Sequence, residues 1–182
     1  MGMKILETQR LVLRRLEASD VTALLGIFSD PEAICHYPAT KTRSEAEDWV
    51  RWTLEGYRRH GFGLWAAVLR DSNEFAGQCG LGVQEVDGEL ESELGHLFLR
   101  RLWGRGLATV AARACGDYAF DHHLGHARLV SLIDPANVAP RRVAGKISMS
   151  LEQQTQEWGN SVCVTPSATR RPDGDAESRN RI

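Results

Sequence analysis

One stretch decides the fold: Glu93-Leu-Gly-His-Leu-Phe-Leu-Arg-Arg-Leu-Trp-Gly-Arg-Gly-Leu-Ala-Thr109. Its apolar first part predicts a strand over 91–99, and the alanine-rich residues that follow predict a helix over 107–123. Between them, the glycines of Arg101-Leu-Trp-Gly-Arg-Gly106 allow a ligand to approach the backbone closely. The free N–H groups at the helix start attract anions, and Arg100, Arg101 and Arg105 add positive charge. This segment therefore predicts a pyrophosphate site, and the alternative is a glycine turn beside a solvated, basic helix start.

Further elements are expected on both sides of this stretch. Before it we expect a strand, two helices and two strands: Arg10–Leu16, Val21–Phe28 capped by Ser19 or Asp20, a helix from a Ser44–Glu47 capping box to His60–Gly61, then 62–69 and 75–86. After it we expect a strand, a helix and two weaker strands: 127–133, 137–147, 150–158 and 161–164. This order predicts a mixed sheet with helices on its faces, and excludes a doubly wound Rossmann sheet.

Composition limits the class of protein. The 182 residues suit a single domain, which we place at 1–165, and the polar residues 166–182 predict a disordered tail. A formal net charge of -2 gives no overall attraction to nucleic acid or to a membrane surface. No apolar run approaches the roughly 20 residues of a membrane span, and Met1–Arg10 has no apolar signal core, so we do not expect export. The four scattered cysteines lack metal-ligand spacing, so we expect reduced, mostly buried thiols, no bound metal and a cytoplasmic location.

Four further motifs accompany the Arg-x-x-Gly-x-Gly segment in order along the chain. They are Glu7-Thr-Gln-Arg-Leu-Val-Leu-Arg14, Gly61-Phe-Gly-Leu-Trp-Ala66, Gly77-Gln-Cys-Gly-Leu81, and Asp134-Pro-Ala-Asn137 before a helix that contains Arg142-Val-Ala144. Together they resemble the GNAT acetyltransferase superfamily, and in particular its RimJ/RimL-like branch. The resemblance implies the α/β (α+β) GNAT fold: a mixed, mostly antiparallel sheet with splayed central strands and helices on both faces.

The resemblance also implies a cosubstrate, acetyl-CoA, and the residues that hold it. The backbone of 101–106 would bind the pyrophosphate, and the pantetheine arm would lie between the strand at 96–99 and its splayed neighbour at 127–133. The implied contacts are His96, Leu97, Phe98, Leu99, Arg101, Leu102, Trp103, Gly104, Arg105, Gly106, Leu107, Ala108 and Asn137. Asn137 also suits the N-cap of the following helix, and the sequence favours that role.

Glu93 is the catalytic candidate that the resemblance supports, as a base that acts through water on the incoming amine. Its alternative is an exposed carboxylate in an acidic run with Glu89 and Glu91. His96 is expected to be a packed imidazole rather than a base. The family's serine, which could protonate the leaving thiolate, is replaced by Pro140, and its tyrosine acid by Ala144, so the sequence identifies no general acid.

Three functions remain open on these grounds. The first is an N-acetyltransferase that moves an acetyl group from acetyl-CoA to a primary amine, on a peptide N-terminus or a small molecule, with a homodimer allowed. The second is a non-catalytic acyl-CoA-binding or sensing domain, which Pro140 and the missing acid make reasonable. The third is a nucleotide-phosphate-binding module. The acceptor is not identified, since acceptor pockets lie on variable segments, here 37–43 and 155–161.

Overall fold

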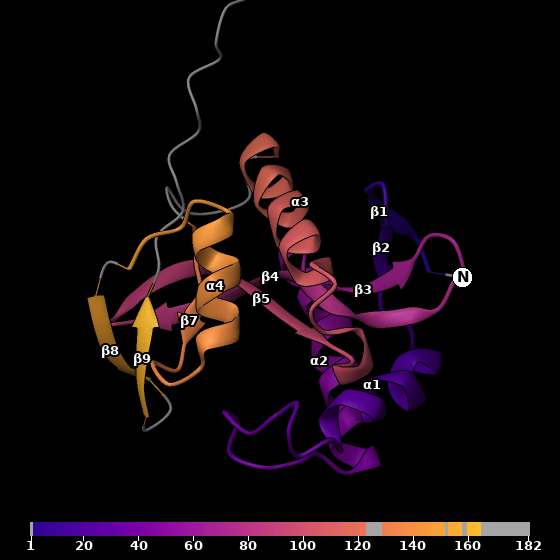
Figure 1. Cartoon of the computed structure of the whole chain (residues 1–182), viewed down its shortest axis with the longest axis horizontal. Helices are drawn as coiled ribbons and strands as arrows, with labels where there is room; N and C mark the ends of the chain where they lie inside the picture. The colour runs from indigo at the N-terminus through magenta and orange to yellow at the C-terminus, as the bar shows by residue number, and fades with distance from the viewer. Residues whose placement is uncertain (1, 123–128, 152, 158–159, 165–182) are drawn as a thin grey trace, which may run out of the picture.

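The computed structural model describes residues 2–122, 129–151, 153–157 and 160–164. Two sheets form its frame (Figure 1). The larger has the order β1-β2-β3-β4-β5-β6, and the smaller has the order β7-β9-β8. In the larger sheet only the β5–β6 pair is parallel. The strands are Lys4–Glu7, Leu11–Arg15, Leu64–Leu69, Phe75–Val86, Glu89–Phe98, Leu129–Val130, Leu132–Ile133, Gln153–Glu157 and Asn160–Val164.

Helices cover both faces of the larger sheet, as expected, because side chains alternate along its strands. On one face Ala66 and Val68 of β3 pack against α1 (Val21–Phe28) and α2 (Arg43–His60). On the other face Trp65 and Ala67 pack against α3 (Leu107–Asp121). Helix α4 (Val138–Lys146) lies beside α3 (Figure 1). The expected mixed, mostly antiparallel sheet is confirmed.

The small, buried side chains of α3 explain how closely this helix lies on the sheet. Ala111, Ala112 and Cys115 have no exposed surface. The Sγ atom of Cys115 lies 3.5 Å from that of Cys79 on β4. Both thiols are free and buried, whereas Cys35 is exposed. In the described part of the chain, no helix combines the length and the apolar character that a membrane crossing requires.

Three expectations about element boundaries were wrong. The capping box of α2 is formed by Thr42 and Glu45, two residues before the expected Ser44–Glu47 pair. Gly61 ends that helix with a φ of 81°, as expected. The strand β1 was not expected, because its four residues do not alternate clearly. The single strand expected over 127–133 is two short strands in different sheets, β6 and β7, and residues 127–128 lie outside the described residues.

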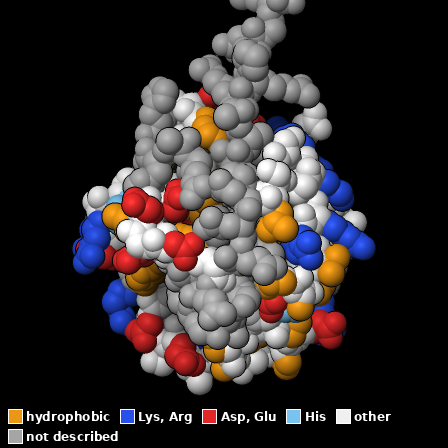
Figure 2. Space-filling model, turned by 90° about the vertical axis from the view of Figure 1, so that its left-hand side faces the viewer, with side chains coloured by type: hydrophobic (Ala, Val, Ile, Leu, Met, Phe, Trp, Pro, Cys, Tyr) orange, Lys and Arg blue, Asp and Glu red, His pale blue; other side chains and the backbone are white. Residues whose placement is uncertain are grey.

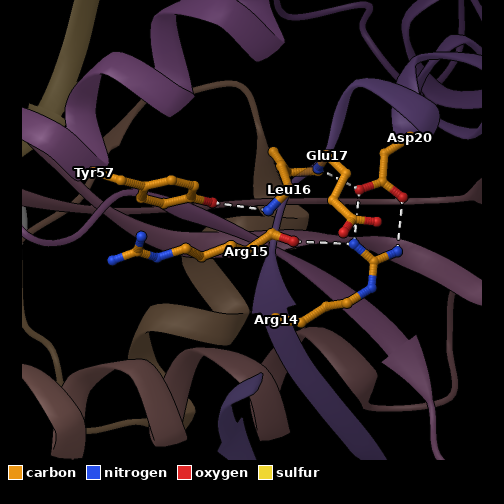
Figure 3. Close-up of polar contacts among 6 residues, drawn as sticks. All are labelled: Arg14, Arg15, Leu16, Glu17, Asp20 and Tyr57. Atoms are coloured by element: carbon orange, nitrogen blue, oxygen red, sulfur yellow. Dashed lines mark hydrogen bonds and ion pairs between the residues drawn. The ribbon is translucent and has the colours of Figure 1, made fainter. Parts of the chain in front are cut away.

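A polar network fixes the chain where β2 leads into α1 (Figure 3). The Arg14 guanidinium donates two hydrogen bonds to Asp20, at 2.8 and 2.7 Å. The Tyr57 hydroxyl accepts a hydrogen bond from the Leu16 N–H at 3.0 Å and donates one to the Leu64 carbonyl. Asp20 therefore takes part in this ion pair. The side-chain cap of α1 that was expected from Ser19 or Asp20 is not formed.

Candidate active site

A gap opens along one edge of β5. On its other edge β5 pairs with β4 without interruption from Glu89 to Phe98. Toward β6 it pairs only at Ser92 and Glu93. The next strand of the chain, β7, belongs to the smaller sheet. The expected splay of the central strands is thereby confirmed, and it begins directly after Glu93.

Strand parity identifies the backbone groups that face this gap. Leu99 donates its N–H to Ala76 at 2.9 Å, on the β4 side. Because backbone groups alternate between the two edges, those of Leu94, His96 and Phe98 face the gap. The Leu94 carbonyl accepts the Ser131 hydroxyl at 2.8 Å, and the Phe98 carbonyl accepts the Trp103 indole N–H at 2.8 Å. The N–H and C=O of His96, between them, lie beyond the last β5–β6 pair.

The loop after β5 presents a row of backbone donors. Gly104 and Gly106 have φ of 75° and 74°, the left-handed conformation that favours glycine. Val110 is the first residue of α3 whose N–H bonds back along the chain, to the Gly106 carbonyl at 3.2 Å. Across the described residues, the N–H groups of 104–109 donate to no other backbone group. A Cβ on Gly104 would meet no atom within 4 Å, so the space beside this glycine is open.

The arginines of this loop differ from expectation. Arg100 pairs with Asp30 at 2.7 Å, and Arg101 pairs with Glu74. Only Arg105 has no ion pair with a described residue. Arg10, which sequence reasoning had not selected as a site residue, donates to the Arg105 carbonyl at 2.6 Å and so holds the loop to the start of β2. Two of the three arginines that were expected to add positive charge at this loop are therefore already paired with carboxylates.

The side chains of most other predicted site residues lie in or against the core. Leu102 and Leu107 are buried in the core beneath α3, and Ala108 packs against that core. Phe98 faces the same core, whereas Leu97 packs on the opposite face with α1 and α2. Burial lowers the pKa of His96 to about 4, so its imidazole is neutral at pH 7.

Asn137 lies at the N-cap position of α4, where its side chain makes no capping hydrogen bond. The cap role that the sequence favoured is therefore wrong. The Asp134 carboxylate accepts the Ala136 N–H at 2.8 Å, one residue before this position, and so orders the turn that leads into α4. The Asn137 amide is left half-buried beside the helix start.

Glu93 spans the start of the gap. Its carboxylate accepts hydrogen bonds from the Gln84 side chain and from the backbone N–H of Leu132, the first residue of β7. Its side chain remains partly accessible, but protein surrounds it on most sides. This desolvation raises the pKa of Glu93 to about 7, against those two hydrogen bonds, which lower it. Glu93 is therefore not the exposed surface carboxylate of the alternative reading.

The segment between α1 and α2 brings Tyr37 to Glu93. Tyr37 keeps 49% of its surface exposed, yet its hydroxyl lies near the Glu93 carboxylate. Burial of that hydroxyl and the charge of Glu93 raise the pKa of Tyr37 to about 12. The His36 Nδ1 bonds the Asp134 carboxylate at 2.9 Å, which attaches this segment to the start of α4. The sequence marked 37–43 as a variable segment, but no local pattern reveals that the charge of Glu93 acts on Tyr37.

The neighbourhood of the gap is acidic. Glu85, Asp87, Glu89 and Glu91 follow one another at alternate positions through the β4–β5 hairpin. On the side of the molecule that Figure 2 shows, acidic side chains gather to the left of the centre, and basic ones lie mainly toward the left and right margins. Such a field favours the approach of a cation.

Comparison with known proteins is consistent with this geometry. The model of the GNAT acetyltransferase domain matches residues 10–150. The protein YkkB of Bacillus subtilis (strain 168) is 37% identical over 87% of this chain and 92% of its own. An acetyltransferase structure from Agrobacterium tumefaciens str. C58 has a TM-score of 0.78 at 26% identity, over 93% of this chain and 96% of that one.

The fold is shared with RimL as well. RimL, an α-N-protein acetyltransferase of ribosomal L7/L12, has a TM-score of 0.77 at 17% identity, over 93% of this chain and 96% of its own. The family match covers most of the chain and includes the loop, the gap and Glu93. The chain belongs to the GNAT acetyltransferase family.

Proposed function

We propose that this protein is an N-acetyltransferase that transfers the acetyl group of acetyl-CoA to a primary amine, with Glu93 as the base. The observation that carries the proposal is the position of Glu93 at the point where β5 and β6 part. A carboxylate there lies beside the gap that a pantetheine arm would fill. The name of RimL, which shares the fold, supports an amine acceptor.

The residues around the gap fit acetyl-CoA. The free N–H groups of 104–109, with open space beside Gly104, suit a pyrophosphate at the α3 N-terminus. The His96 backbone groups suit the amides of a pantetheine arm, and the Asn137 amide, which makes no capping hydrogen bond, would bind the arm from the start of α4. When bound, acetyl-CoA supplies a thioester whose carbonyl carbon the amine attacks.

The amine must lose a proton before it attacks. An α-amine with a pKa near 7.8 requires only about 1 kcal/mol for this at pH 7, whereas a lysine with a pKa of about 10.4 requires about 4.6 kcal/mol. A base with a pKa of about 7 is well suited to deprotonate an α-amine. Glu93 would accept the proton, directly or through a water, while Gln84 and Leu132 hold its carboxylate in place.

Tyr37 is the neutral hydroxyl nearest to this chemistry among the groups described above. Its raised pKa keeps the proton on the phenol at neutral pH. Tyr37 would therefore donate a proton or a hydrogen bond toward the departing thiolate, the role for which the sequence offered no candidate.

An acceptor screen tests the proposed function. The screen offers peptide amides, polyamines and aminoglycosides as acceptors. We expect the acceptors that carry an α-amine to release free thiol from acetyl-CoA. Binding of CoA without turnover by any amine would favour the alternative, a sensing domain. The loop is tested by Gly104→Asn, since asparagine tolerates a positive φ and its side chain would enter the space of the pyrophosphate. We expect CoA affinity to fall at least about tenfold, with the melting temperature nearly unchanged.

A further inference from the structure

Strand β4 is longer than the strand beside it. β3 pairs with β4 only as far as Gly80, which lies opposite Leu64, the first residue of β3. The Leu81 N–H still reaches the Gly63 carbonyl at 3.1 Å. By parity, the backbone groups of Val83 and Glu85 face the same side. In the part of the chain that the structure describes, no strand pairs with them there.

A cavity of about 470 Å³ lies beside this free edge. The second half of α2 forms one wall, including the half-exposed Trp52. Leu81, Gly82 and Val83 of β4 form the other. The cavity thus joins an apolar surface to a strand edge with free N–H and C=O groups, which is the combination that binds an extended peptide by strand addition.

Gly82 connects this cavity to Glu93. The two residues are directly opposite in the β4–β5 ladder, so their side-chain positions share one face of the sheet. A Cβ on Gly82 would meet no atom within 4 Å. The space directly above Gly82 is therefore open, and the distance from a strand added at the free edge of β4 to β5 is two strand spacings, or about 10 Å.

We infer that the acceptor is a peptide bound in extended form along the free edge of β4 at Val83 and Glu85. This inference rests on the proposed function of Glu93. About three residues at about 3.3 Å each would cross from Glu93 over Gly82. The α-amine would lie at the carboxylate, and residues from about the fourth onward would pair with β4.

Charge at the rim of the cavity specifies the peptide further. Arg51 pairs with Asp48, while Arg58 and Arg59 share the single carboxylate of Glu55. Three guanidinium groups thus face two carboxylates. An acidic side chain beyond the third residue of the peptide would complement the excess positive charge, as the acidic surroundings of Glu93 complement its ammonium end.

A series of peptides tests this inference. Peptide amides of one to eight residues, with one N-terminal residue throughout and an Asp or Ala at position five, are compared by kcat/KM. We expect a rise of at least tenfold between three and six residues, and a further severalfold gain with Asp. N-methylation of single amides beyond position three should lower kcat/KM at every second position, because only alternate N–H groups face β4.

Two chain variants accompany the peptide series. Gly82→Val should leave the fold and CoA affinity unchanged and lower kcat/KM for long peptides at least tenfold, because it obstructs the route to Glu93. The matched control is Gly145→Val in α4, where a Cβ also meets no atom within 4 Å; it should leave turnover unchanged. Amide exchange at Val83 and Glu85 reports peptide binding without turnover, and both amides should be protected.

The outcomes separate the two proposals. Equal kcat/KM for a single amino acid amide and an eight-residue peptide would overturn the peptide inference and leave the proposed function standing. Protection of Val83 and Glu85 without acetylation would support the peptide site and count against catalysis by Glu93. Neither protection nor turnover of any peptide, with CoA bound, would overturn the peptide inference.

Discussion

The two edges of β5 differ in how far they pair with a neighbouring strand. One edge forms a ladder of ten residue pairs with β4, and the other forms two pairs with β6 and then stands free. The ladder side has the flanking core and the sulfur contact between Cys79 and Cys115. The free side has Glu93, the gap-facing groups of His96 and the donor loop. A single strand is thus anchored by one edge, so that the other edge can present unpaired backbone to a ligand.

Proline substitutions at neighbouring positions test this contrast most severely. Leu97→Pro removes an N–H from the ladder side and should destabilise the protein by about 3 kcal/mol or more. His96→Pro removes an N–H from the free side, so the melting temperature should fall only slightly. CoA binding should weaken at least about tenfold. His96→Ala is the control for the side chain. Equal melting temperatures for the two proline variants would contradict the assigned parity.

Glu93→Gln removes the charge at the start of the gap while keeping the shape of the side chain. General-base catalysis is typically worth 10²–10⁴-fold. Because an α-amine needs little help, we expect kcat to fall about 10²-fold near pH 7, with CoA affinity unchanged in calorimetry. The loss should shrink at higher pH, where more of the amine is already neutral. A loss that does not depend on pH would assign Glu93 to acceptor binding instead.

The same variant makes a separate prediction for stability. Folding raises the pKa of Glu93 from 4.5 to about 7, so the folded protein disfavours the carboxylate. This destabilisation is absent below pH 4.5, grows up to about pH 7 and is complete above it. Glu93→Gln should therefore be no more stable than the wild type at pH 4.5, and about 1–3 kcal/mol more stable at pH 8. Melting curves at both pH values measure the difference.

Trp103→Phe makes a smaller change, at the far end of the gap. It removes the indole N–H that occupies the Phe98 carbonyl and holds the donor loop to the end of β5. We expect a loss of about 1 kcal/mol in stability and a severalfold weaker affinity for CoA, with kcat at saturation little changed. Unchanged affinity would mean that the glycines alone set the position of the loop.

The sequence predicted those parts of the molecule that local patterns encode. The splay and the loop were located by the predicted strand over 91–99, by the helix that begins at Leu107 and by the family motifs. The capping box of α2 was predicted two residues too late, because Ser44–Glu47 and Thr42–Glu45 satisfy the same sequence pattern. The cap role of Asn137 failed where Pro140, the third residue of α4, has no N–H to donate to a capping side chain. The Arg10 bond to Arg105 joins residues far apart in sequence, and so does the effect of the Glu93 charge on Tyr37, so no window of sequence contains either.

Some predictions still await a test. A single domain over 1–165, a cytoplasmic location and a homodimer are among them, as are the individual roles of the site residues. The predicted disordered tail from 166 lies outside the described residues. The expectation that no metal is bound is also untested, although the described residues contain no group of three or more His, Cys, Asp or Glu side chains that could hold an ion.

The strand order of the larger sheet has a consequence for how the protein is made. β1 to β6 lie side by side in the order in which the ribosome produces them. Each new strand can therefore add to the growing edge during synthesis, at the rate at which the chain emerges. The smaller sheet is different, because β7 pairs with β9, which is produced about thirty residues later. During synthesis β7, across the gap from Glu93, thus gains its partner last, and a nascent chain halted before Asn160 would hold the donor loop while β7 still lacked β9.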